Sequence, residues 1–133
     1  MIKLFIGGKG SGKTKTLIEL TNAAAESSKG SVVCIERGEK LRHEITYKAR
    51  LIDTDDYFIN DAEALYGFIA GILASNSDIT DLFVDASLKI CGYKVDEFGA
   101  MLPKIEKIAE NVNVVMTVSI AVDECPESIK VYA

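Results

Sequence analysis

Eight consecutive residues near the start of the chain combine four glycines, two lysines and two hydroxyl side chains. In order they are Gly7, Gly8, Lys9, Gly10, Ser11, Gly12, Lys13 and Thr14. Glycine adopts positive φ angles and has no Cβ, so such a segment can wrap its backbone N–H groups around a ligand. Phosphate oxygens need many donors close together, and this spacing fits the phosphate-binding pattern G-x-x-x-x-G-K-[ST], the P-loop.

All eight residues are therefore expected to bind the phosphates of a nucleotide, most of them through the backbone. Lys13 is expected to reach the β- and γ-phosphates and so to take part in catalysis, while the Thr14 hydroxyl would ligate Mg²⁺. Lys9 is either a second phosphate contact or an exposed side chain. An apolar run precedes the segment and a helical pattern follows it, which is the arrangement that this motif requires.

Two carboxylates follow apolar runs of strand length, and both are candidates for the same site. Asp85 is expected to hold the water shell of Mg²⁺ beside Thr14; the alternative is an ordinary capping aspartate. Glu36 is expected to orient or activate an attacking water; the alternative is a solvated loop charge. Asp85 is followed by Ala86 rather than by a glutamate, which favours Glu36 as the base and also favours weak hydrolysis.

Two hydroxyl residues near the end of a later strand are further candidates for the same site. Thr117 and Ser119 could contact a γ-phosphate if they lie at the ligand-binding edge. Hydroxyl side chains are common in strands, however, so an ordinary role is favoured for both.

Apolar runs typical of strands alternate along the chain with periodic patterns typical of helices. Strands are expected over residues 2–6, 31–35, 82–85 and 114–120, with a short one over 129–132. Helices are expected over 14–28 with Gly30 as a C-terminal cap, from Asn60 as N-cap with Glu63 as its capping-box partner, and over 95–112. Pro103 either kinks that last helix or starts its regular part.

This alternation predicts an α/β fold of three layers with a mainly parallel central sheet of about five strands. Polar and apolar residues alternate over 45–51, which indicates a half-exposed strand that could form an edge hairpin. Ligands of parallel sheets bind at the carboxyl ends of the strands. The P-loop, Glu36 and Asp85 all fall at that edge, so they should converge.

The length, charge and cysteine content of the chain indicate its domain number and its cellular compartment. A chain of 133 residues is expected to form one domain, 1–133, and a net charge of −5 argues against a broad nucleic-acid surface. Three cysteines without a C-x-x-C pair fit the reducing cytoplasm better than a disulfide framework. No apolar run approaches the ~18 residues of a membrane helix, and a strand leading into a P-loop is not a signal peptide.

The order of these features resembles the RecA-like branch of P-loop NTPases. The chain has a P-loop, then VVCIE ending in Glu36, then LFVDAS containing Asp85, then VVMTVSI. The resemblance implies the three-layer P-loop NTPase fold, a catalytic glutamate at Glu36 and a Walker B aspartate at Asp85. The segment after Glu36 is also similar in layout to thymidine kinase, although that family's zinc-binding cysteines and second acidic residue are missing.

The sequence therefore predicts a cytoplasmic, Mg²⁺-dependent ATP-binding domain with ATPase activity. ATP is the expected nucleotide because the guanine-reading pattern N-K-x-D is absent. One alternative is a small nucleoside-kinase-like phosphotransferase. Another is a non-hydrolysing module that changes its assembly state on binding ATP, with a protein partner or a second copy of the chain.

Overall fold

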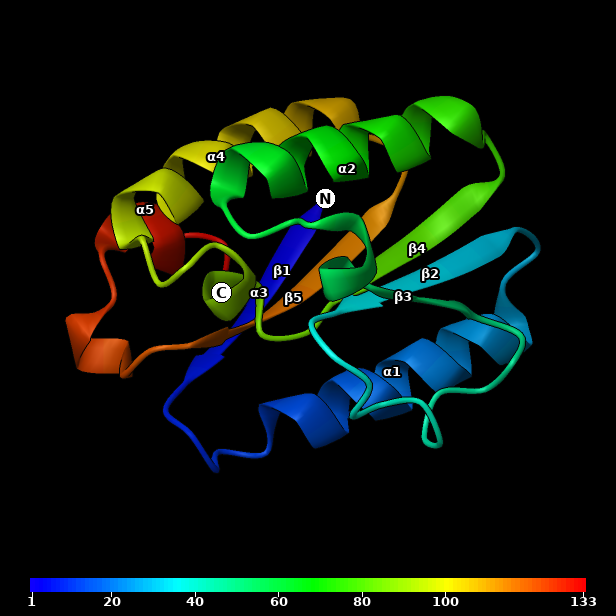
Figure 1. The fold of residues 1–133 in the computed structure, drawn as a ribbon, viewed down its shortest axis with the longest axis horizontal. Helices are drawn as coiled ribbons and strands as arrows, with labels where there is room; N and C mark the ends of the chain where they lie inside the picture. Colours follow the sequence, from blue (N-terminus) through cyan, green and yellow to red (C-terminus); the bar gives the residue numbers. More distant parts are fainter.

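The centre of the computed structural model is one sheet of five strands, all of them parallel (Figure 1). The strands are β1 (Ile2–Gly7), β2 (Ser31–Glu36), β3 (Arg50–Asp53), β4 (Ile79–Val84) and β5 (Asn113–Ser119). Their order in the sheet is β1-β5-β4-β2-β3, so β5 lies between β1 and β4. The expected α/β class and strand number are confirmed, and the carboxyl ends of all five strands meet at one edge.

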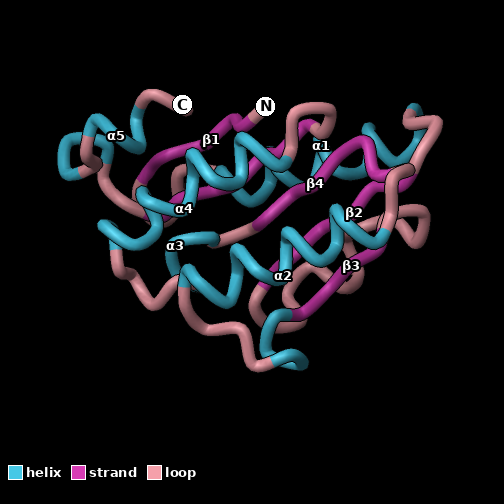
Figure 2. Tube along the Cα trace, turned by 90° about the horizontal axis from the view of Figure 1, so that it is seen from above, coloured by secondary structure: helices cyan, strands magenta, loops and turns pink.

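Helices cover the two faces of the sheet and complete the three layers (Figures 1 and 2). Helix α1 (Lys13–Ser27) lies on one face, and α2 (Ala62–Ser75) and α4 (Val95–Ile108) lie side by side on the other. The shorter elements are α3 (Ser87–Ile90), α5 (Glu127–Lys130) and single 3-10 turns at Thr54–Tyr57 and Val122–Glu124. None of the helices has both the length and the apolar composition that crossing a lipid bilayer requires.

The unbroken apolar runs of the strands follow from burial on both faces. In β2, Val33 and Ile35 belong to the larger core cluster, together with residues of α2 and α4. Val32 and Cys34 alternate with them and pack in the smaller cluster with Leu17 of α1. Successive side chains of a strand point to opposite faces, so both faces of this central strand must be apolar.

The segment between β2 and β3 corrects the expected edge hairpin. Residues 38–49 form bends and turns, and β3 begins only at Arg50, parallel to β2 rather than antiparallel. Leu41, Ile45 and Ala49 are buried in the α1-side cluster, whereas Tyr47 is 91% exposed. The buried residues therefore recur every fourth position, and the alternation that indicated a strand does not describe this segment.

A side chain of α1 holds this segment in place. The Asn22 Nδ2 atom donates to the Glu44 carbonyl at 2.8 Å, and the Thr46 backbone N–H donates to Asn22 Oδ1 at 2.8 Å. The nitrogen and the oxygen of the Asn22 side-chain amide thus both form hydrogen bonds with the same loop. The loop therefore packs against the α1 side of the sheet.

The expected N-cap Asn60 and its capping-box partner Glu63 are wrong, and one of the two alternatives for Pro103 is excluded. Asp61, not Asn60, caps α2, because its Oδ1 accepts the Ala64 backbone N–H at 2.7 Å. Helix α4 is regular from Val95 onward and contains Pro103 in its interior, so its regular part does not start at that proline.

The expected strand over 129–132 is also absent, since α5 and a turn occupy this part of the chain. The segment still meets the sheet edge at one point, where the Leu4 backbone N–H donates to the Tyr132 carbonyl at 2.9 Å. Ile129 is buried in the larger cluster. Its apolar character therefore reflects packing of a short helix rather than a strand.

The three cysteines are unpaired and buried, as the absence of a disulfide pattern indicated. The pKa of Cys34 is raised to about 12, mainly by burial and in addition by nearby acidic charges. Burial also raises the pKa of Cys91 to about 12. These two thiols stay protonated near neutral pH, so they act as small apolar side chains in the core.

Gly30 serves a different purpose from the expected helix cap. Helix α1 ends at Ser27, and a Cβ on Gly30 would collide with the Asp78 carbonyl oxygen and lie 2.8 Å from Thr80 Cγ2. The Ser31 N–H donates to the same carbonyl at 2.8 Å, which explains the close approach. The position thus requires a residue without a side chain.

We predict that Gly30→Ala lowers the free energy of unfolding by about 1–3 kcal/mol, because the added methyl meets backbone that cannot move aside. Gly71→Ala is the matched control, since it lies exposed in α2 with nothing within 4 Å of its Cβ position. The free energy of unfolding of Gly71→Ala should rise by about 0.5–1 kcal/mol, because alanine has less backbone entropy to lose on folding than glycine. Urea unfolding of both variants tests this, and equal effects would contradict the packing account.

Candidate functional site

The loop between β1 and α1 has the shape that its glycines were expected to allow. Gly10 and Gly12 both have φ of +84°, a conformation that other residues adopt at a cost. A Cβ on Gly7 would lie 2.7 Å from Ser11 Oγ, so the loop folds back closely onto its own start. Nothing lies within 4 Å of the Cβ positions of Gly8, Gly10 and Gly12, and that side of the loop is open.

The start of α1 is left free to bind an anion. No side chain caps this helix, and its first turn contains no acidic residue. The backbone N–H groups of a helix's first turn have no partner within the helix, and they carry partial positive charge. A phosphate at this position would supply the missing acceptors.

Lys13 lies over the loop that precedes it. Its Nζ donates to the Gly8 carbonyl at 3.0 Å and to Ser11 Oγ at 3.2 Å. Partial burial lowers the pKa of Lys13, and the nearby charge of Asp85 opposes that effect. An ammonium group held by two weak neutral acceptors can exchange them for phosphate oxygens.

Asp85 and Thr14 are brought together although 71 residues separate them. Thr14 Oγ1 donates to Asp85 Oδ1 at 3.1 Å. Asp85 follows β4 directly, and its backbone N–H donates to the Ile35 carbonyl of β2 at 2.8 Å. A hydroxyl beside a carboxylate is a hard-oxygen donor pair, which is the kind of ligand that Mg²⁺ prefers, so these residues fit the metal expected here.

Thr117 is a site residue whose part the sequence did not reveal. Its Oγ1 donates to Asp85 Oδ1 at 2.8 Å and accepts the Ala86 backbone N–H at 2.7 Å. It is buried, and its carbonyl accepts the Ser87 hydroxyl at 2.8 Å. From the sequence, Thr117 was a candidate only for contacting a γ-phosphate. In the structure its hydroxyl instead holds the carboxylate of Asp85 in place. The one signal was a polar residue inside the apolar run VVMTVSI.

Glu36 ends β2, as expected, but its carboxylate is directed to its own loop. The side chain is 3% exposed, and both of its oxygens accept the Leu41 backbone N–H, at 3.3 and 3.2 Å. Burial raises the pKa of Glu36; the Leu41 N–H opposes this, and the charges of Asp85 and Asp53 raise it further. Glu36 lines a small cavity of about 170 Å³ with Asp53 and Asp56, and is not among the residues lining the P-loop cavity.

The P-loop cavity has a volume of about 700 Å³ and lies at the carboxyl edge of the sheet. Its lining residues come from the P-loop, from the loop after β2, from the segment around α3 that begins at Asp85, and from the end of β5 and the turn after it. Ser119 is among these lining residues. The charged residues around the cavity are Lys9, Lys13, Lys40, Asp85, Lys89 and Glu124. With four lysines and two carboxylates, the cavity favours an anionic ligand.

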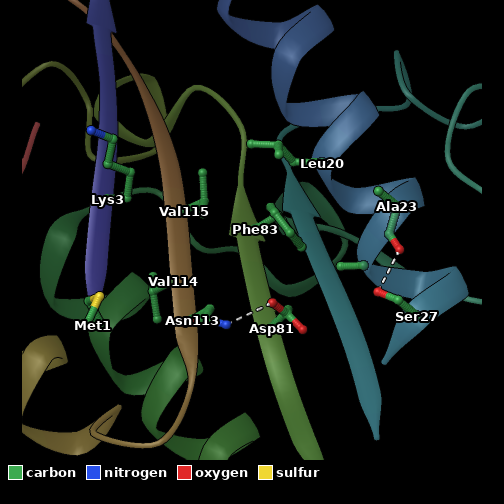
Figure 3. A pocket seen from close by; sticks show the side chains of 11 residues that line it. Met1, Lys3, Leu20, Ala23, Ser27, Asp81, Phe83, Asn113, Val114 and Val115 are labelled. Carbon is green, nitrogen blue, oxygen red and sulfur yellow. Dashed lines mark hydrogen bonds between the residues drawn. The ribbon is translucent and has the colours of Figure 1, made fainter. Parts of the chain in front are cut away.

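A second cavity, of about 370 Å³, lies on the α1 face near the opposite ends of the strands (Figure 3). Met1 and Asn113, near the starts of β1 and β5, mark its position, and Leu20 of α1 and Phe83 of β4 give it apolar walls. Asn113 Nδ2 donates to Asp81 Oδ1 at 3.3 Å within it. None of the P-loop residues lines this cavity, so the P-loop cavity is the candidate functional site.

Comparison with known proteins supports the fold. No family model matches the chain, and no curated protein matches its sequence. Among solved structures it is similar to PCH-2 of C. elegans, with a TM-score of 0.55 and 14% sequence identity. The similarity covers 99% of this chain and 33% of PCH-2, so the chain spans about a third of the length of that protein. At this identity the comparison shows a shared α/β fold.

We predict that Thr117→Val weakens Mg²⁺-dependent ATP binding by about 10-fold, because a hydrogen bond to a charged carboxylate is lost. Thr117→Ser keeps the hydroxyl and should behave like the wild type. Calorimetric titration with ATP, in Mg²⁺ and in EDTA, measures the effect, and melting temperatures check that both variants are folded. If the valine variant retains the full effect of Mg²⁺, Thr117 does not orient Asp85 for the metal.

Proposed function

We propose that this domain binds Mg-ATP in the P-loop cavity and hydrolyses it slowly, as a RecA-like P-loop ATPase. The observation that carries the proposal is the bond of 3.1 Å between Thr14 Oγ1 and Asp85 Oδ1. It joins the end of the P-loop to the end of β4 in the cavity that Lys13 also lines. A cytoplasmic location is part of the proposal, because ATP and reduced thiols both belong to that compartment.

The residues would divide the work of binding by position. The backbone N–H groups of Gly8–Thr14 would surround the phosphates, and Lys13 would exchange its bonds to Gly8 and Ser11 for β- and γ-phosphate oxygens. Thr14 and Asp85 would hold Mg²⁺, which when bound neutralises charge on the same phosphates. Water would attack the γ-phosphorus in line, the bond to the bridging oxygen would break, and ADP and phosphate would leave.

The proton released by that water requires an acceptor, and Glu36 is the candidate that the sequence proposed. Its raised pKa makes it a better base than an exposed glutamate. To act, it must first release the Leu41 N–H, because it lies in a cavity separate from the P-loop. This requirement makes slow turnover the expected behaviour.

The position of Glu36 in a cavity separate from the P-loop also favours a second candidate function. This is a nucleotide-responsive binding module with little or no hydrolysis. In that case Glu36 serves to hold the loop after β2, and binding of ATP is read by a protein partner or by a second copy of the chain. A phosphate-release assay with and without added nucleosides separates the ATPase from a nucleoside-kinase-like phosphotransferase, and tight ATP binding without turnover would select the binding module.

We predict that Lys13→Ala lowers the affinity for Mg-ATP by at least ~10-fold, because charge-assisted hydrogen bonds to phosphate are removed. Lys29→Ala is the control: it removes an exposed lysine just beyond α1. Calorimetric titration measures both. A folded Lys13→Ala protein with wild-type affinity would refute the assignment of the P-loop.

We predict that Glu36→Gln keeps its affinity for ATP and lowers turnover by about 10²-fold, since the base acts in the transition state. Glutamine has nearly the same shape and can still accept the Leu41 N–H, so the loop should stay in place. Glu39→Gln, an exposed acid on the same loop, is the matched control. Unchanged turnover in Glu36→Gln would leave Glu36 with a structural role, and tight binding without turnover in the wild type would select the binding module.

A further inference from the structure

The P-loop cavity carries more positive charge than the P-loop motif itself supplies. Lys9 and Lys13 belong to the P-loop, but Lys40 follows β2 and Lys89 lies in α3. This enrichment occurs in a chain with a net charge of −5. Lysines from three separate segments around one cavity indicate a ligand with negative charge on more than one side.

None of these four lysines is neutralised by a carboxylate. The five ion pairs of the structure involve other residues, and each is at the surface. The carboxylates of the cavity, Asp85 and Glu124, therefore do not pair with Lys89 within 4.0 Å. The Lys89 ammonium remains available to a ligand.

Lys89 is carried by a turn that is fixed to the metal-binding carboxylate. Ala86, at φ +51°, turns the chain directly after Asp85, and its N–H donates to Thr117 Oγ1 at 2.7 Å. Ser87 anchors the same turn by donating to the Thr117 carbonyl at 2.8 Å. Lys89 is half-buried, whereas Lys40 is exposed on a loop. Of the two lysines outside the P-loop, Lys89 is thus the one whose backbone is held rigidly relative to Asp85.

We propose that Lys89, carried by α3, binds the γ-phosphate in addition to the P-loop, and so distinguishes a nucleoside triphosphate from a diphosphate. This inference rests on the proposed ATP site. Thr14 and Asp85 would hold Mg²⁺ between the β- and γ-phosphates, which places the terminal phosphate beside Asp85. Lys89 follows Asp85 by four residues and lines the same cavity. A cation at this position would stabilise the negative charge that develops on the γ-phosphate in the transition state. It would do so in the way of an arginine finger, but from within the same chain.

The test compares affinities for Mg-ATP and Mg-ADP by calorimetry in the wild type, Lys89→Ala and Lys89→Arg. Lys89→Ala should lose about 10-fold or more in ATP affinity, the usual effect of losing one charge-assisted hydrogen bond, and about 2-fold or less in ADP affinity. Lys89→Arg should restore most of the preference for ATP. The control Lys94→Ala removes the same charge five residues away, outside the cavity, and should change neither affinity.

Each outcome decides something different. An equal loss for ATP and ADP, or no loss for either, in a folded Lys89→Ala protein overturns the inference while leaving the proposed ATP site in place. A wild type that binds neither nucleotide overturns the proposed function and the inference together. A larger loss for ATP than for ADP that arginine restores supports the inference, because a merely structural lysine would affect both nucleotides.

Discussion

The carboxylate of Asp85 is the point on which the site depends. One of its oxygens accepts hydroxyls from Thr14 and Thr117, at 3.1 and 2.8 Å, and so joins the P-loop helix to β5 and β4. Hydrogen bonds to a charged group contribute about 1.5–3 kcal/mol each. The order of the sheet makes this junction available, since β5 lies between β1 and β4 and places Thr117 between the P-loop strand and Asp85.

The parallel sheet explains why chemistry is confined to one edge. The inner strands β2, β4 and β5 are mostly buried, so charged groups within them would lose their hydration without a partner. At the carboxyl edge the chain leaves the sheet, and polar groups there contact both the cavity and the ends of neighbouring strands. The altered pKa values of Lys13 and Glu36 reflect this setting, because burial lowers the first and raises the second.

Features dictated by local chemistry could be predicted from the sequence. The P-loop requires glycine at the positive φ angles of Gly10 and Gly12, and that requirement is visible in the motif. The apolar runs predicted the parallel sheet, and their ends predicted that Asp85 would meet Thr14. These inferences depend on spacing and strand direction, both of which the sequence contains.

Features decided by tertiary contact could not be predicted in this way. Thr117 is one hydroxyl in an apolar strand, and its partner Asp85 becomes visible only when β4 and β5 are paired. The turns over 38–49 bury every fourth residue against the α1 layer and are tied down by Asn22. Gly30 looks like a helix cap in sequence, but its neighbour is the Asp78 carbonyl on another segment.

Glu36 lies where the sequence predicted, at the end of β2, but its carboxylate contacts its own loop rather than the P-loop cavity. It is connected to that cavity through the Lys40–Leu41 segment: Leu41 donates its N–H to Glu36, and Lys40 and Leu41 both line the P-loop cavity. In the proposed ATP complex, a movement that brings Glu36 toward the γ-phosphate would therefore also move Lys40, a cation that lines the same cavity. The proposed catalysis by Glu36 would then change the position of a positive charge near the phosphates. The role proposed for Lys89 does not depend on that loop, because the turn that leads into α3 is anchored to Thr117 of β5.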